Sequence, residues 1–142
     1  MQVTVMYHNF LGLWRLVPEC SNFEQGEAPV EGGYRIEETA NGALKFHIEW
    51  TDIAGEDHHY SFSGKADGQP HTFPGGDLAD SLSITAVNNT ELNTAAYFKD
   101  CERMVVKRVL MDGGLYMDVH QTVRLPDGTE PSNFSRYIKV TH

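Results

Sequence analysis

Apolar and polar residues alternate along much of the chain with the period of two that is typical of β-strands. The clearest run lies at 43–51, where Leu44, Phe46, Ile48 and Trp50 alternate with polar residues. Such alternation predicts one dry face and one wet face. No run shows a helical period over ten residues. Runs of β-branched and aromatic residues predict strands at 10–17, 33–39, 43–51, 57–64, 81–87, 91–99, 103–110, 114–124 and 132–140.

Turn signals such as Asn41-Gly42 and Asp127-Gly128 separate these strands and indicate successive hairpins. Longer connections are expected at 18–32 and 65–79. The fold class is therefore all-β, an antiparallel up-and-down meander. Closure would remove exposed strand edges, so we expect a barrel of about nine to ten strands without a helical lid. A two-sheet sandwich is the alternative, and 1–142 is expected to form a single domain.

Turn positions also predict which residues face each other across the hairpins. Two-residue turns at the last two Asp-Gly sites place Arg108 opposite Met117, and Val119 opposite Arg136. Both arginines then lie in apolar rows on the dry face, on either side of the strand 114–124. Two strand spacings of about 4.8 Å would separate their backbones, so both side chains could reach one anion.

The turn positions of three other hairpins predict one regular register and two irregular connections. The hairpin after 43–51 is predicted to pair Trp50 with His58 and Glu49 with His59, which places Tyr60 on the dry face. Two-residue turns at Asn41-Gly42 and Asn88-Asn89 would set apolar residues opposite polar ones, so we expect a bulge or a longer loop at each.

Charge narrows the set of partners. The chain has 11 Lys+Arg against 20 Asp+Glu, a net charge of −9, which repels nucleic acid and anionic membranes. No apolar stretch approaches the length of a membrane helix, and the N-terminus lacks the pattern of a signal peptide. These observations favour a cytoplasmic protein in which Cys20 and Cys101 are reduced. The alternative is an exported form in which the two cysteines make one disulfide bridge.

A homodimer is compatible with the sequence.

The segment at 9–16, Asn-Phe-Leu-Gly-Leu-Trp-Arg-Leu, resembles the opening motif of the lipocalins and fatty-acid-binding proteins, with Gly12 and Trp14 at the matching positions. This resemblance to the calycin superfamily implies a barrel with an internal cavity that binds small hydrophobic molecules. The chain departs from fatty-acid-binding proteins in two ways. The segment between the first two strands looks unable to form a helix pair, and Arg136 and Tyr137 are adjacent where that family has Arg-x-Tyr. The pattern best resembles an intracellular, bacterial-style member.

A buried guanidinium is costly unless it is paired, so an inward arginine binds an anion, meets an internal acid or stacks on a ring. The resemblance implies that Arg136 packs across Trp14, with anion binding as the alternative. For Arg108, ligand binding and a structural ion pair are both open. The residues expected to bind a ligand are Arg108, Arg136, Gln121, Met117, Val119, Phe46, Trp50 and Tyr60.

Signals for metals and catalysis are weak. None of the seven histidines has the spacing of a zinc site, and a single histidine as a haem ligand stays open. Nucleophile-elbow, phosphate-loop and His-Glu-x-x-His motifs are absent. The sequence therefore predicts a carrier of a small hydrophobic, acidic ligand, with no cofactor and no metal. The alternatives are a barrel enzyme of the isomerase or cyclase type, or an oligomeric scaffold with a filled interior.

Overall fold

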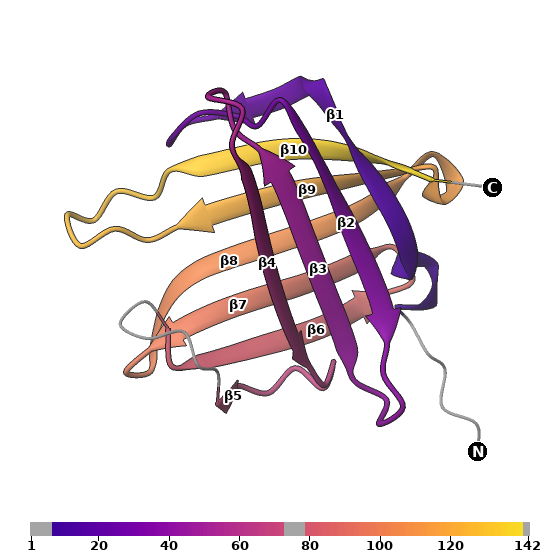
Figure 1. The fold of residues 1–142 in the computed structure, drawn as a ribbon. Coiled ribbons are helices and arrows are strands. Elements are labelled where there is room, and N and C mark those ends of the chain that lie inside the picture. Colours follow the sequence, from indigo (N-terminus) through magenta and orange to yellow (C-terminus); the bar gives the residue numbers. More distant parts are fainter. Residues whose placement is uncertain (1–6, 73–78, 141–142) are drawn as a thin grey trace.

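The computed structural model describes residues 7–72 and 79–140, which form ten antiparallel strands in one sheet (Figure 1). Two short 3-10 turns, η1 (His8–Phe10) and η2 (Asp112–Gly114), complete the described structure. The strands are β1 (Gly12–Phe23), β2 (Glu31–Glu38), β3 (Leu44–Thr51), β4 (Asp57–Gly64), β5 (His71–Thr72), β6 (Ser81–Asn88), β7 (Glu91–Phe98), β8 (Cys101–Met111), β9 (Tyr116–Val123) and β10 (Ser132–Lys139).

The sheet is a meander whose first and last long strands pair with each other. Its order is β4-β3-β2-β1-β10-β9-β8-β7-β6-β5, so the sheet curls into a nearly closed barrel (Figure 1). No α-helix occurs in the described part of the chain, so it holds no helix long enough to cross a membrane. The predicted all-β meander without a helical lid is confirmed.

The nine predicted strands all form, with two additions. β1 continues to Phe23, past the expected end at 17, and its ladder with β10 is interrupted between Val17 and Asn22. Pro18 lies in this interruption, where its missing N–H breaks no ladder bond. β5 lies within the connection expected at 65–79, of which 73–78 is outside the described residues, as is His142.

At one seam of the barrel, between β4 and β6, no continuous hydrogen-bonded ladder joins the strands. β4 and β6 approach each other without continuous pairing, and the chain between them makes one isolated bridge, Asp67 to Thr85. A Cβ built on Gly64 would lie 3.2 Å from Ile84 Cδ1, so the seam is tight at that level. The barrel is therefore closed here by side-chain contact, by this bridge and by a hydrogen bond from Gly68 N to the carbonyl of Ile84 at 2.9 Å, and by continuous ladders elsewhere.

The barrel has a closed end and a mouth. At the closed end the indole Nε1 of Trp14 donates to the carbonyl of Phe10 at 2.9 Å, which ties η1 across the opening. Gly12, the other motif residue, has φ +124°, a conformation that L side chains rarely adopt. The expected stacking of Arg136 on Trp14 is wrong, because Lys139 takes that place with its ammonium 5.0 Å from the ring centroid.

At the opposite end β1 leaves β2. The two strands pair only over Gly12–Arg15 and Gly33–Ile36, whereas β2 pairs with β3 along its whole length. From Leu16 onward β1 follows β10 alone. This divergence opens the mouth of the barrel.

Two predicted registers shift. Arg108 faces Val119 instead of Met117, because η2 makes the turn longer than two residues, and the even shift leaves Arg108 on the inner face. Arg136 faces Asp118 instead of Val119, an odd shift that moves Arg136 to the outer face and Tyr137 to the inner one. The prediction that both arginines point inward is therefore wrong for Arg136.

The remaining hairpins follow the predictions. Trp50 pairs with His58 and Glu49 with His59, as expected. A longer loop spans 39–43, closed by a hydrogen bond from Thr39 N to the carbonyl of Ala43 at 2.7 Å. The ladder between β6 and β7 is bulged between 86 and 88. Both departures from a two-residue turn are confirmed.

Candidate ligand-binding site

Arg108 lies inside the barrel on β8 and is 1% exposed. Its Nη1 donates to Thr94 Oγ1 at 3.1 Å and its Nη2 to the hydroxyl of Tyr34 at 3.4 Å. The guanidinium carbon is 4.8 Å from the ring centroid of Phe46. No ion pair between described residues includes Arg108, and its buried Nε donates no hydrogen bond. The described interior thus holds a cation without a carboxylate partner.

Two tyrosines flank this cation. Tyr34 on β2 and Tyr137 on β10 contact edge to face, with ring centroids 4.9 Å apart. Burial raises the pKa of Tyr137, the electrostatic effect of nearby Tyr34 raises it further, and the positive charge of Arg108 opposes the rise. Tyr137 is therefore neutral at physiological pH and keeps its proton as a hydrogen-bond donor.

Neither tyrosine was among the predicted site residues. Tyr34 lies two residues before Ile36 in the predicted strand 33–39, so both side chains point to the same face. The alternation alone could therefore have placed Tyr34 inside the barrel. Tyr137 was assigned to the wrong face because the register of the last hairpin slipped by one residue. No local pattern in β10 shows this, since Phe134 and Ile138 make its outer row look like the dry one.

Arg136 has a different environment on the outer face. Its Nε and Nη2 donate to the two carboxylate oxygens of Asp118 at 2.6 and 2.9 Å, a bidentate ion pair. This pair raises the pKa of Arg136 above its usual value. The carboxylate is largely buried, and the guanidinium lies 5.2 Å from the ring of Tyr116. Arg136 therefore already has an anion, supplied by the protein.

The other predicted residues lie at different depths of the interior. Val119 faces Arg108 across the β8–β9 ladder, and Met117 is fully buried nearer the closed end. Gln121 lies nearer the mouth, with its Nε2 3.3 Å from the sulfur of Met104. Trp50 and Tyr60 belong to the inner row of β3 and β4, close to the mouth. The structure thus brings Phe46 and Val119 to Arg108 and spreads the rest along the barrel.

A half-open hollow of about 830 Å³ occupies the mouth where β1 parts from β2. Gly32 suits this place, because a Cβ would lie 3.5 Å from Leu16 Cδ2 and 3.0 Å from the carbonyl oxygen of Glu49, and the second distance is tighter than most Cβ contacts. Arg108 does not line this hollow and lies deeper in the barrel. The hollow opens to both faces of the sheet, because its lining mixes inner and outer residues, apolar and charged: Arg15, Leu16, Pro18, Val30, Glu31, Gly32, Glu49, Trp50, Thr51, Asp57, His58 and His59.

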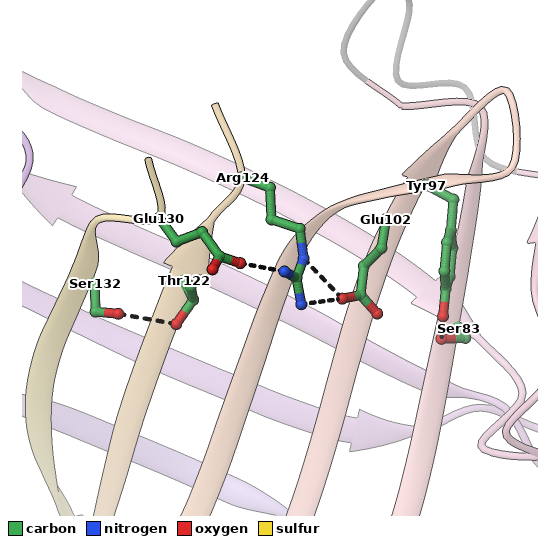
Figure 2. Close-up of polar contacts among 7 residues, drawn as sticks. All are labelled: Ser83, Tyr97, Glu102, Thr122, Arg124, Glu130 and Ser132. Carbon is green, nitrogen blue, oxygen red and sulfur yellow. Dashed lines mark hydrogen bonds and ion pairs between the residues drawn. The ribbon is translucent and has the colours of Figure 1, made fainter. Parts of the chain in front are cut away.

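Ion pairs fix the strand ends on the other side of the mouth (Figure 2). Arg124, just after β9, donates to Glu102 on β8 at 3.0 and 2.7 Å and also bonds Glu130, just before β10. Thr122 and Ser132 add a hydroxyl contact of 3.0 Å between β9 and β10. Exposed pairs of this kind stabilise little but hold the geometry of the rim.

One group of side chains could approach a metal ion, at the hairpin between β3 and β4. Ligand atoms of Asp52, Glu56 and His58 lie within 4.8 Å of one another. Asp52 already accepts hydrogen bonds from the backbone of Ala54 and Glu56 and from His58 Nε2 at 2.8 Å. The bond from His58, followed by those from the backbone, lowers the pKa of Asp52. The group therefore serves as an internal cap of the turn.

Several solved structures share the fold of this barrel. The fluorescent protein UnaG matches with a TM-score of 0.61 at 15% identity, over 94% of this chain and 98% of that one. As-p18, an extracellular fatty acid binding protein, matches with a TM-score of 0.59 at 14% identity, over 96% and 100%. Bovine odorant binding protein, in complex with its natural ligand, matches with a TM-score of 0.50 at 12% identity, over 100% and 78%.

These likenesses show a calycin-like β-barrel. At such low identities they concern the fold alone, and neither a protein-family model nor a curated protein matches the sequence. The expected calycin-like barrel fold is confirmed, whereas membership of the superfamily stays a prediction.

Proposed function

We propose that this chain binds a small hydrophobic molecule with an anionic group and that Arg108 holds that group inside the barrel. The observation that carries the proposal is the uncompensated charge of Arg108, which is 1% exposed and has no described acidic partner. Burying such a charge is unfavourable, so a site that retains it gains from an anion arriving with a ligand.

The surroundings of Arg108 suit this role. Its Nε is free to donate, the hydroxyl of Tyr34 contacts the guanidinium, and the ring of Tyr137 packs against Tyr34. Carboxylates commonly accept two or more such bonds, and charge-assisted bonds are about twice as strong as neutral ones. The apolar body of the ligand would extend from Val119 and Phe46 toward Gln121, Trp50 and Tyr60 at the mouth.

Two of the fold neighbours support a binding role. As-p18 is described as a fatty acid binding protein and the bovine protein as an odorant binding protein with its natural ligand bound. The strong negative charge of this chain disfavours nucleic acid as a partner.

The test compares an acid with its neutral analogue. A fluorescent dansyl-labelled long-chain fatty acid and its methyl ester are titrated into the wild type, Arg108→Met and Arg35→Met. Arg35 is the matched control, because it lies on the outer face with its side chain 62% exposed and its removal changes the net charge equally.

The wild type and Arg35→Met should bind the acid about tenfold or more tighter than the ester, a preference worth one charge-assisted contact. Arg108→Met should lose this preference and keep its affinity for the ester. Equal binding of the acid by wild type and Arg108→Met would contradict the role of Arg108. If the wild type binds neither probe, a scaffold with a filled interior becomes the better interpretation.

A further inference from the structure

The inner face of β3 and β4 carries a row of flat rings that leads from the mouth to Arg108. Trp50 and His58 stack at the mouth with centroids 5.2 Å apart and planes at 20°. Phe46 and Phe62 stack further in, at 4.6 Å and 13°. Tyr60 lies between the two pairs, 5.8 Å from Phe62. The cross-strand register brings these rings together, because each pair consists of directly opposed residues.

The row ends at the buried cation. The guanidinium carbon of Arg108 lies 4.8 Å from the ring centroid of Phe46, across the barrel from β8. An anionic group held by Arg108 would therefore place the adjoining part of its ligand against the inner end of the row.

Part of this row is uncovered. Tyr60 is 45% exposed although its neighbours in the same row, Phe46 and Ile48, are buried or half-buried. Trp50 borders the hollow at the mouth, and Phe62 is only partly buried. The row also borders the seam beside β4, where no further strand is paired to it. Tyr60, Phe62 and Trp50 thus keep ring surface that no neighbouring side chain covers, along the unpaired edge of β4 and at the mouth.

The opposing wall carries smaller or more adaptable side chains. Arg108 reaches Phe46 from β8, so β8 and its neighbour β7 face the aromatic row. β7 presents Thr94 and Ala96 inward, and β8 presents Met104 nearer the mouth. Methionine adjusts its shape readily to a neighbouring surface. The two walls differ sharply in kind, one of stacked rings and one of small or flexible groups.

We infer that the ligand is a planar, aromatic or conjugated acid rather than a saturated fatty acid. This inference rests on the proposed function, because it takes Arg108 as the anchor of the acid group. A planar ligand gains offset stacking on Tyr60, Phe62 and Trp50 in addition to the burial of its area. A saturated chain of equal area gains only the burial and loses more conformational freedom on binding.

Calorimetry with two probes of matched apolar area tests the inference. We use 2-anthracenecarboxylic acid as the planar acid and a saturated straight-chain acid as the flexible one, each against the wild type, Tyr60→Leu, Tyr97→Leu and Arg108→Met. Tyr97 is the matched control, since its hydroxyl contacts Ser83 on the outer face, 3.3 Å away (Figure 2). Leucine at position 60 keeps an apolar side chain but removes the ring.

The planar acid should bind the wild type about tenfold or more tighter than the saturated acid. Tyr60→Leu should weaken the planar acid about two- to tenfold and leave the saturated acid within about twofold, whereas Tyr97→Leu should change neither. Stacking should also shift the proton resonances of the bound anthracene upfield.

The outcomes separate the two proposals. If the saturated acid binds as tightly as the planar acid, and both lose affinity in Arg108→Met, the aromatic inference is wrong and the proposed function stands. If Tyr60→Leu leaves the planar acid unaffected, stacking on the row is also wrong. If Arg108→Met binds both acids as the wild type does, or if neither acid binds, the proposed function itself fails.

Discussion

The two halves of the barrel interior are lined alike but packed differently. At the closed end Trp14, Leu44, Leu92 and Met117 are at most 2% exposed and form one continuous core. Toward the mouth the inward side chains belong to the same alternating rows, yet Tyr60 is 45% exposed and Trp50 borders a hollow. An inward direction therefore does not by itself mean a filled core. Arg108 lies where the two halves meet.

The difference has a topological cause. At the closed end η1 covers the opening, with Phe10 completely buried beneath it, and all strands from β1 to β3 stay paired. At the mouth β1 departs toward β10 and no described helix covers the gap. The closed end is thus the better packed half, and the mouth is the half through which the proposed ligand would enter.

The largest expected effect is the difference in free energy of unfolding between substitutions of Trp14 at the closed end and of Trp50 at the mouth. Trp14→Ala should reduce the free energy of unfolding by about 3–5 kcal/mol, because it removes a fully buried ring from a packed core. Trp50→Ala should cost only about 1 kcal/mol, since part of that side chain already meets the hollow. Urea denaturation of both variants measures the contrast. Equal losses would show that the mouth is as tightly packed as the closed end.

A smaller effect on the free energy of unfolding, of opposite sign, is expected from a substitution of Arg108, which lies between the closed end and the mouth. Arg108→Met should raise the free energy of unfolding by about 1–3 kcal/mol, because it replaces a buried unpaired charge by an apolar side chain of similar length. The exposed control Arg35→Met should stay within about 0.5 kcal/mol of the wild type. Thermal unfolding without ligand measures both variants. A loss of stability in Arg108→Met would mean that its contacts with Thr94, Tyr34 and Phe46 serve the fold.

The smallest effect is on how the free energy of unfolding depends on alkaline pH, and it distinguishes the inward tyrosines Tyr137 and Tyr60. Burial raises the pKa of Tyr137 and of Tyr60 above the usual 10.0, more strongly for the more deeply buried Tyr137. A raised pKa in the folded state gives stability that is complete below the unfolded value and is lost as the pH rises toward the folded one. Stability should therefore fall above about pH 10.

Tyr137→Phe should flatten this alkaline loss, and Tyr60→Phe should change it less. Urea midpoints measured across the alkaline range, with tyrosinate absorbance as the second signal, provide the measurement. A larger flattening of the alkaline loss in Tyr60→Phe than in Tyr137→Phe would contradict the view that the mouth is less tightly packed than the closed end.

Much of the fold could be predicted because its signals are local. Alternation in β3 and β4 located both strands and paired Trp50 with His58 correctly. Failure of the two-residue turn at Asn88 correctly indicated a bulge or a longer loop, and the structure has a bulge. The short β5 and the continuation of β1 past Pro18 were missed, because they depend on strands distant in the sequence.

The sequence by itself determined the order of the strands, the meander and the inward direction of Arg108. These follow from a period of two within single strands and from the turn residues between them. Only the tertiary structure decided that Arg136 faces outward to Asp118 while Tyr137 and Tyr34 join Arg108. The physical reason is that a loop sets the register across a hairpin, and a slip of one residue exchanges the two faces of a strand. Whether an inward row is covered depends likewise on strands far away in the chain.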